Sequence, residues 1–272
     1  MYLWITIGGI AFLFLTTLFG SALVFCFKKE PSRKSGALFL GLTSGIMLAA
    51  SVWSLIFPAL AEAENGWGRC AFIPVSVGIF LGALFLWCAD KFLPCIESGK
   101  ENAKTSALLK NPLKLFFAIT LHNIPEGLAV GFAFGVAWAV RTQAAFAVAA
   151  SLALGIGIQN LPEGAAVALP MRTEFKSKRK AFYYGAASGI CEAAFAVLGC
   201  FMAAYLRSLQ PWLLAFSAGA MLFVVAEELI PSANSIEISA QNGTEKTADY
   251  THAAWGATLG FILMMILDVA LG

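Results

Sequence analysis

The sequence predicts an all-α integral membrane protein with eight transmembrane helices in a 3+2+3 arrangement that contains an inverted repeat. The first observation is composition: 59% of the 272 residues are hydrophobic, 12% are charged, and the mean hydropathy is +0.78, values that soluble domains do not reach. The second is that the apolar runs are continuous and lack the two-residue alternation of barrel strands. The third is a motif that occurs twice near the middle of the chain.

Eight apolar runs reach or exceed the roughly 20 residues that a helix needs to cross ~30 Å of hydrocarbon. The first run lacks the cleavage pattern of a signal peptide, so we expect it to remain as a helix. We expect a single transmembrane transporter domain over residues 1–272, with helices at residues 2–27, 36–61, 71–93, 112–140, 144–171, 181–206, 212–232 and 253–271.

Basic residues are distributed unevenly between the two sides of this predicted bundle. Of 18 lysines and arginines, all but Arg69, Arg141 and Arg207 lie near the connections after the first, third, fifth and seventh helices. By the positive-inside rule, we expect both termini to be extracytoplasmic. The basic connections are short and lack interleaved aromatic residues, so we interpret them as topology determinants and not as nucleic-acid or lipid-headgroup sites. The six cysteines form no CxxC pair, so neither a zinc ribbon nor a disulfide framework is indicated.

The fourth and fifth predicted helices share a motif. "HNIPEGLAV" at residues 122–130 is echoed by "QNLPEGAAV" at residues 159–167. Consecutive spanning helices run in opposite directions, so the two copies enter the membrane centre from opposite sides. A weaker echo links residues 44–58 of the second helix to residues 218–231 of the seventh. These echoes predict an in-plane pseudo-two-fold axis, a plan that recurs in secondary transporters.

The shared motif places polar side chains on one face of each helix. His122 and Glu126 are separated by four residues, as are Gln159 and Glu163, so each pair can point at one small object. Asn123 and Asn160 each precede a glutamate by three residues.

A proline lies within each copy of the motif. Pro125 cannot donate a hydrogen bond to the carbonyl of Leu121, and Pro162 likewise frees the carbonyl of Ile158. We therefore expect each helix to be loosened at the turn that carries its polar groups.

A third carboxylate, Glu192, falls near the middle of the sixth predicted helix, at a depth similar to that of Glu126 and Glu163. No lysine or arginine lies at this depth to pair with the three carboxylates, and unpaired charge in hydrocarbon is costly. A bound cation would compensate them. Imidazole with carboxylate and amide oxygens favours Zn²⁺, Fe²⁺, Mn²⁺ or Co²⁺ over Na⁺, and Met47 in the second helix could add a thioether sulfur.

At these motifs the sequence resembles the ZIP (Zrt- and Irt-like protein) family of divalent-metal transporters, and more particularly its GufA-like branch. The resemblance is carried by "HNIPEG", "QNLPEG", "SGICEA" and "EELIP" in the fourth to seventh helices. It implies a binuclear metal centre near the membrane midplane. In it, a first site would use His122, Glu126, Gln159 and Glu163 with Met47 as an additional ligand, and a second site would use Asn123, Asn160 and Glu192 and share the central glutamates.

The chain departs from the family pattern at three places. Many members have histidine at the position of Gln159, which weakens the expectation of strict zinc selectivity. Some close relatives have aspartate at the position of Asn160, which bears on occupancy of the second site. The segment between the third and fourth helices, residues 94–111, contains no histidine, so metal sensing through loop imidazoles is not expected.

The function that these observations predict is import of a divalent metal ion into the cytoplasm by alternating access, through a site between helices four and five. Zn²⁺ is the expected substrate, and Fe²⁺, Mn²⁺, Co²⁺ and Cd²⁺ remain candidates. The metal would be cargo, so no cofactor, enzymatic activity or nucleic-acid partner is expected. A homodimer fits the family, and the expected location is the lipid bilayer of the plasma (inner) membrane.

Two other functions use the same cluster. A gated metal channel would differ only in how the ion is released. An intramembrane metalloenzyme is disfavoured because the sequence has no HExxH motif, no Glu-x-x-His pair of the di-iron type and no nucleophile beside a base. Glu227 and Glu228 lie near the predicted end of the seventh helix, and solvation at that end and a role in the ion pathway are both open.

Overall fold

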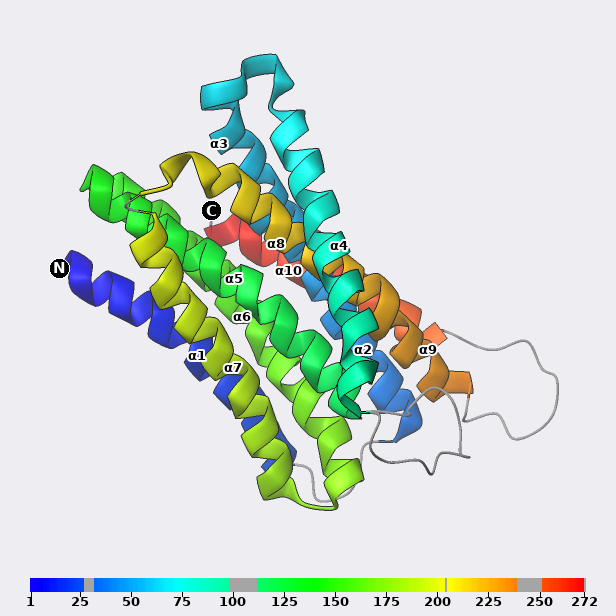
Figure 1. Cartoon of the computed structure of the whole chain (residues 1–272). Helices are drawn as coiled ribbons and strands as arrows, with labels where there is room; N and C mark the ends of the chain where they lie inside the picture. Colours follow the sequence, from blue (N-terminus) through cyan, green and yellow to red (C-terminus); the bar gives the residue numbers. More distant parts are fainter. Residues whose placement is uncertain (27–31, 98–111, 204, 239–250, 272) are drawn as a thin grey trace.

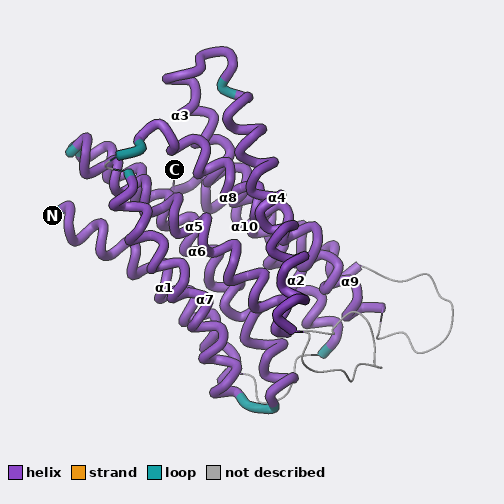
Figure 2. Tube along the Cα trace, viewed as in Figure 1, coloured by secondary structure: helices purple, strands orange, loops and turns teal. Residues whose placement is uncertain are grey.

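The computed structural model describes residues 1–26, 32–97, 112–203, 205–238 and 251–271. This part of the chain is almost entirely helical and has no strand (Figure 2). It contains eight helical spans that are long and apolar enough to cross a membrane. The prediction of an all-helical integral membrane protein with eight spans is therefore confirmed.

Six of the spans are single α-helices: α1 (Tyr2–Cys26), α4 (Phe72–Glu97), α5 (Pro112–Val140), α6 (Gln143–Phe175), α7 (Lys178–Met202) and α10 (Thr251–Leu271). The second span is composite and consists of α2 (Arg33–Ala50), the π-helical η1 (Ser51–Ile56) and α3 (Phe57–Trp67). The seventh is composite in the same way, with α8 (Gln210–Val224), the π-helical η4 (Val225–Leu229) and α9 (Ile230–Ile238).

The spans form two groups that lie side by side (Figure 1). The first bundle contains α1, α5, α6 and α7, and the second contains α2–α3, α4, α8–α9 and α10. Within the first, α1 packs most extensively on α6 and α5 on α7; within the second, α2 packs on α10 and α4 on α8. Exchanging spans one to three with six to eight, and four with five, converts each of these pairings into another. The packing therefore has the 3+2+3 arrangement with an inverted repeat.

Glycine allows close helix approach inside each bundle. A Cβ added to Gly131 of α5 would fall on the carbonyl of Ala196 in α7, and one added to Gly45 of α2 would fall on the carbonyl of Ala257 in α10. Small residues let helix backbones approach closely where lipid supplies no hydrophobic drive for association. Among the glycines whose surroundings the structure describes, only Gly155 would place its Cβ against a residue of the other bundle. The bundles are therefore tightly packed within themselves and more loosely packed against each other.

Neither Pro125 nor Pro162 ends its helix, because both α5 and α6 continue as α-helices through these residues. The expected loosening at each proline stays a prediction. In the two spans related by the weaker echo, π-helical turns precede Pro58 and Pro231. There the amides of Phe57 and Ile230 bond to carbonyls five residues earlier. A proline removes one helical donor in either setting, and the surrounding packing decides whether the ladder continues or widens.

The composite seventh span is longer than predicted because it continues to Ile238 and not only to residue 232. Glu227 and Glu228 consequently lie within the span, in η4, and not in its last turn.

Candidate metal centre

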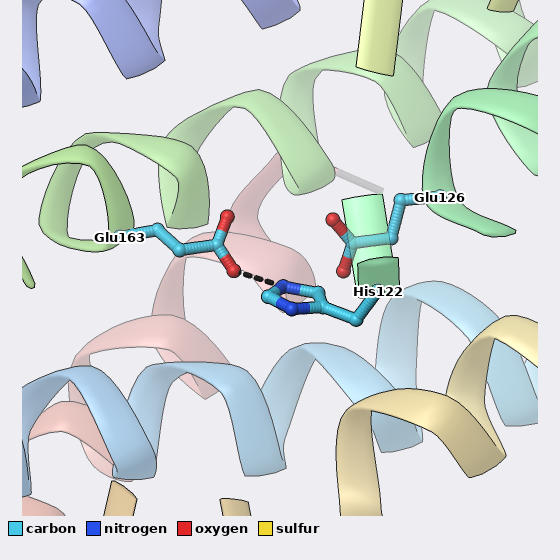
Figure 3. A group of neighbouring side chains, drawn as sticks. All are labelled: His122, Glu126 and Glu163. Atoms are coloured by element: carbon cyan, nitrogen blue, oxygen red, sulfur yellow. Dashed lines mark hydrogen bonds and ion pairs between the residues drawn. The ribbon is translucent and has the colours of Figure 1, made fainter. Parts of the chain in front are cut away.

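Three buried side chains form the centre of the site. His122 and Glu126 come from α5 and Glu163 comes from α6, and each offers one ligand atom within 4.8 Å of the other two. All three side chains are fully buried. Figure 3 shows the two carboxylates facing each other with the imidazole between them. One nitrogen and several oxygens converging on one point are a donor set suited to a divalent transition metal.

The helical periodicity explains how α5 contributes two groups to this point. His122 and Glu126 are one turn apart, so their side chains leave α5 on the same face. Gln159 and Glu163 have the same relation on α6, and both are buried.

Hydrogen bonds connect the two motifs reciprocally across the interface between α5 and α6. The imidazole Nε2 of His122 pairs with Oε1 of Glu163. In the other direction, the amide Nε2 of Gln159 donates to Oε1 of Glu126 at 2.7 Å. Each glutamate is therefore held by the residue that begins the motif of the opposite helix. This arrangement is the inverted repeat expressed at the level of single side chains.

A second polar cluster lies beside the first, between α5, α6 and α7. The amide Nδ2 of Asn160 donates to Oε2 of Glu192 at 2.6 Å, and Nδ2 of Asn123 donates to the backbone carbonyl of Ser188 at 3.3 Å. Glu192 does not belong to the group of three ligand atoms around His122. The structure thus brings Asn160 and Glu192 together and leaves Glu192 outside the central three-residue group.

Unpaired acceptor oxygens are the strongest sign of a cation in this region. Six of the eight buried side-chain atoms that lack a hydrogen-bond partner in the described part of the chain belong to the two clusters, and all six are oxygens: Asn123 Oδ1, Glu126 Oε2, Gln159 Oε1, Asn160 Oδ1, Glu163 Oε2 and Glu192 Oε1. Buried polar atoms are rarely left unpaired. No lysine or arginine in the described residues is buried that could pair with them.

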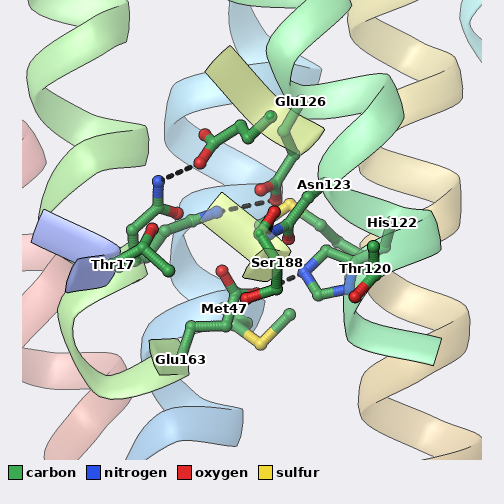
Figure 4. Close-up of polar contacts among 12 residues, drawn as sticks. Thr17, Met47, Thr120, His122, Asn123, Glu126, Glu163 and Ser188 are labelled. Carbon is green, nitrogen blue, oxygen red and sulfur yellow. Dashed lines mark hydrogen bonds and ion pairs between the residues drawn. The ribbon is translucent and has the colours of Figure 1, made fainter. Parts of the chain in front are cut away.

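Met47 is the sequence-predicted residue that comes from the second bundle. It lies on α2, is fully buried, and points toward the polar cluster on α5 and α6 (Figure 4). Its counterpart in the repeat, Met221 on α8, is also buried and accepts a hydrogen bond from Ser51 Oγ at 3.6 Å. The thioether of Met47 therefore lies where the second bundle faces the polar cluster of the first.

Sequence reasoning missed one carboxylate inside the spans. Asp268 on α10 accepts a hydrogen bond from Ser54 Oγ at 2.6 Å, and its Oδ2 is another buried oxygen without a partner in the described residues. Gly155 of α6 lies against this pair, because an added Cβ would be 2.7 Å from Ser54 Oγ. An isolated aspartate near the end of the chain carries no motif, although a single acidic residue within an apolar span is itself a signal.

The fold and the site together define a class: a polytopic helical membrane protein with an inverted repeat and a buried, metal-ligating cluster where its two central helices meet. Comparison with known proteins agrees with this class. A family model described as "ZIP Zinc transporter" matches residues 100–268. The chain belongs to the ZIP family.

Relatives in this family match nearly the whole chain. Zinc transporter ZIP11 of Homo sapiens is 35% identical over 97% of this chain and 96% of its own length. Zinc transporter GufA of Myxococcus xanthus is 35% identical over 89% of this chain and 90% of its own length. Zinc transporter ZIPB of Bordetella bronchiseptica is 34% identical over 98% of this chain and 81% of its own length. The resemblance to the ZIP family, and to GufA within it, is confirmed.

Proposed function

We propose that the protein transports divalent transition-metal ions, Zn²⁺ first among them, across the membrane into the cytoplasm. The observation that carries this proposal is the buried group of His122, Glu126 and Glu163, whose ligand atoms lie within 4.8 Å of one another. The similarity to proteins named zinc transporters supports zinc as the substrate. Their names describe transport and not catalysis, which favours a transporter over an intramembrane metalloenzyme.

We propose that the ion occupies the site between α5 and α6. His122, Glu126, Gln159 and Glu163 would bind it with Met47 as an additional ligand. Asn123, Asn160 and Glu192 would form an adjacent second position. The six unpaired oxygens support this assignment, since each could coordinate a metal ion without giving up a hydrogen bond. The site offers one imidazole nitrogen, and Gln159 can offer only its amide oxygen where a histidine would offer a second nitrogen. Fe²⁺, Mn²⁺, Co²⁺ and Cd²⁺ are therefore included as candidate substrates.

The two bundles support an alternating-access mechanism. The site residues other than Met47 lie in the first bundle, and glycine contacts tie its helices together. The contact between bundles at Gly155 is made with side-chain atoms of Ser54 and Asp268 and not with backbone. We infer that α1, α5, α6 and α7 move together with the ion against α2–α3, α4, α8–α9 and α10.

Uptake into proteoliposomes tests the assignment. We expect Glu126→Gln and Glu163→Gln each to lower Zn²⁺ uptake by about 100-fold or more, since even residues that only orient metal ligands contribute about 10–100-fold. Glutamine keeps the shape of the side chain but removes its charge. Glu174→Gln, an exposed glutamate near the end of the same helix as Glu163, is the matched control and should retain parental uptake.

Near-normal uptake by either glutamine variant, in protein that unfolds at the parental temperature, would refute the site. The same vesicles separate a transporter from a gated channel, because alternating access predicts a rate that saturates with metal concentration. A rate that rises without saturation would favour the channel.

A further inference from the structure

A cluster of cations at the turn between α6 and α7 is not used by the proposed transport site. Residues 172–180, the basic turn, contain five basic residues and one acidic residue, Glu174. Only Lys176 and Ser177 separate the two helices, and Ser177 caps α7 by accepting a hydrogen bond from the amide of Lys180. The turn lies at the end of the bundle opposite the two termini (Figure 1). The five basic residues are Arg172, Lys176, Lys178, Arg179 and Lys180.

The fold directs two of these cations onto the protein and leaves two outward. Lys178 Nζ donates to the carbonyl of Phe25 at the end of α1, at 3.3 Å. The ammonium of Lys180 lies 5.9 Å above the ring of Phe175. Lys176, Arg179 and Lys180 are all exposed. Because the ammonium of Lys180 faces a ring, Lys176 and Arg179 are the two exposed cations that we assign to a partner.

The exposed cations continue into an exposed apolar surface on the same helix. Tyr183 lies one turn after Arg179 and is 68% exposed, and Ile190, Val197 and Phe201 follow on the same face with exposures of 57%, 46% and 70%. These four residues are the α7 outer stripe. In a membrane-spanning helix such a face contacts acyl chains, and an aromatic residue at its polar end lies at headgroup depth.

Basic residues at the other end of the bundle are not clustered. Arg69, Arg141 and Arg207 lie on three separate connections, one on each. The basic turn therefore holds an excess of positive charge relative to each connection at that end. Aromatic residues accompany its cations, with Phe175 beneath Lys180 and Tyr183 one turn after Arg179.

We propose that the basic turn and the α7 outer stripe together bind an anionic phospholipid, with its headgroup phosphate at Lys176 and Arg179 and an acyl chain along the stripe. A soluble anion would account for the cations but not for the stripe, and a neutral lipid would account for the stripe but not for the cations. This inference stands apart from the proposed transport of metal. It assigns a second role to charges that the sequence alone indicated only as topology determinants.

The test measures lipid binding to the full chain. Protein in a neutral detergent is titrated with dioleoylphosphatidylglycerol, and bound lipid is counted by native mass spectrometry. We expect the double variant Lys176→Gln, Arg179→Gln to bind this lipid about 30-fold more weakly than the parent, which corresponds to about 1 kcal/mol for each cation. Dioleoylphosphatidylcholine should bind parent and variant alike.

The double variant Arg69→Gln, Arg141→Gln is the matched control. It also removes two exposed cations, and each pair includes one residue with a positive φ, 50° at Lys176 and 58° at Arg141. The control should bind phosphatidylglycerol like the parent. An equal loss in the control would overturn the proposal, because the effect would then reflect total charge. Displacement of the lipid by equimolar glycerol 3-phosphate would also overturn it, because the stripe would then be irrelevant.

A single variant protects the test against misfolding. Arg179 lies in the first turn of α7, so Arg179→Gln leaves the conformation at Lys176 intact. It should weaken phosphatidylglycerol binding about fivefold. Unchanged binding by this variant with parental thermal unfolding would refute a role for Arg179.

Discussion

At the scale of single residues, the reciprocal pairing of the two motifs shows what the histidine that begins one motif and the glutamine that begins the other have in common. His122 pairs with Glu163, and Gln159 donates to Glu126. Either side chain can hold a carboxylate across the interface, but only the imidazole adds a nitrogen ligand for a metal. Gln159 is therefore a structural equivalent of histidine here and a chemically different ligand.

Gln159→Leu tests the structural half of this role. Leucine has a similar volume but cannot donate, so Glu126 Oε1 would lose its hydrogen bond in a buried site. We expect the metal-free protein to be destabilised by about 1–3 kcal/mol. Thermal unfolding in detergent with a chelator would measure the change. Ser217→Ala is the control, since the buried Ser217 Oγ has no partner among the described residues; an equal loss in both variants would contradict the interpretation.

At the scale of helices, close packing within a bundle and looser packing between bundles explain how the first bundle can carry the site as a rigid unit past the second. Gly131 lies where α5 contacts α7 inside the first bundle, and Gly155 lies where α6 contacts the second bundle. Backbone cannot yield to an added methyl group, whereas a serine or aspartate side chain can rotate. Substitutions at the two glycines should therefore have different consequences.

We expect Gly131→Ala to lower the thermal unfolding temperature markedly, because its Cβ would fall on the Ala196 carbonyl and push α5 away from α7. Gly8→Ala is the matched control: an added Cβ there meets nothing within 4 Å, and alanine favours helix by about 1 kcal/mol. Thermal unfolding should show a large decrease for Gly131→Ala and no decrease for Gly8→Ala. Equal stability of the two variants would show that the close contact is not needed.

At the scale of the whole molecule, the even number of spans puts both termini at one end and the basic turn at the other (Figure 1). The positive-inside rule assigns the end with the basic turn to the cytoplasm. We propose on this basis that both termini are extracytoplasmic. From the family resemblance we further propose that the protein is a homodimer in the plasma (inner) membrane.

Two native cysteines at opposite ends test this orientation. Cys26 ends α1 and Cys70 ends η2, and both are exposed. In single-cysteine variants, a membrane-impermeant maleimide added to intact cells should label Cys70. It should label Cys26 only after the cells are permeabilised. The reverse pattern would invert the proposed direction of uptake.

The sequence by itself determined the eight spans, the inverted repeat and the polar motifs. Hydrophobic length and four-residue spacing report directly on a single helix, so the shared faces of His122 and Glu126 could be predicted. Membership of the ZIP family followed from the same motifs.

Only the tertiary structure decided which side chains meet across helices. It paired Gln159 with Glu126, joined Asn160 to Glu192, kept α5 and α6 continuous through their prolines, and brought Asp268 to Ser54. Periodicity cannot give such pairings, because they depend on which helix lies opposite. That choice is set by close backbone contacts between residues far apart in the chain, such as Gly131 with Ala196.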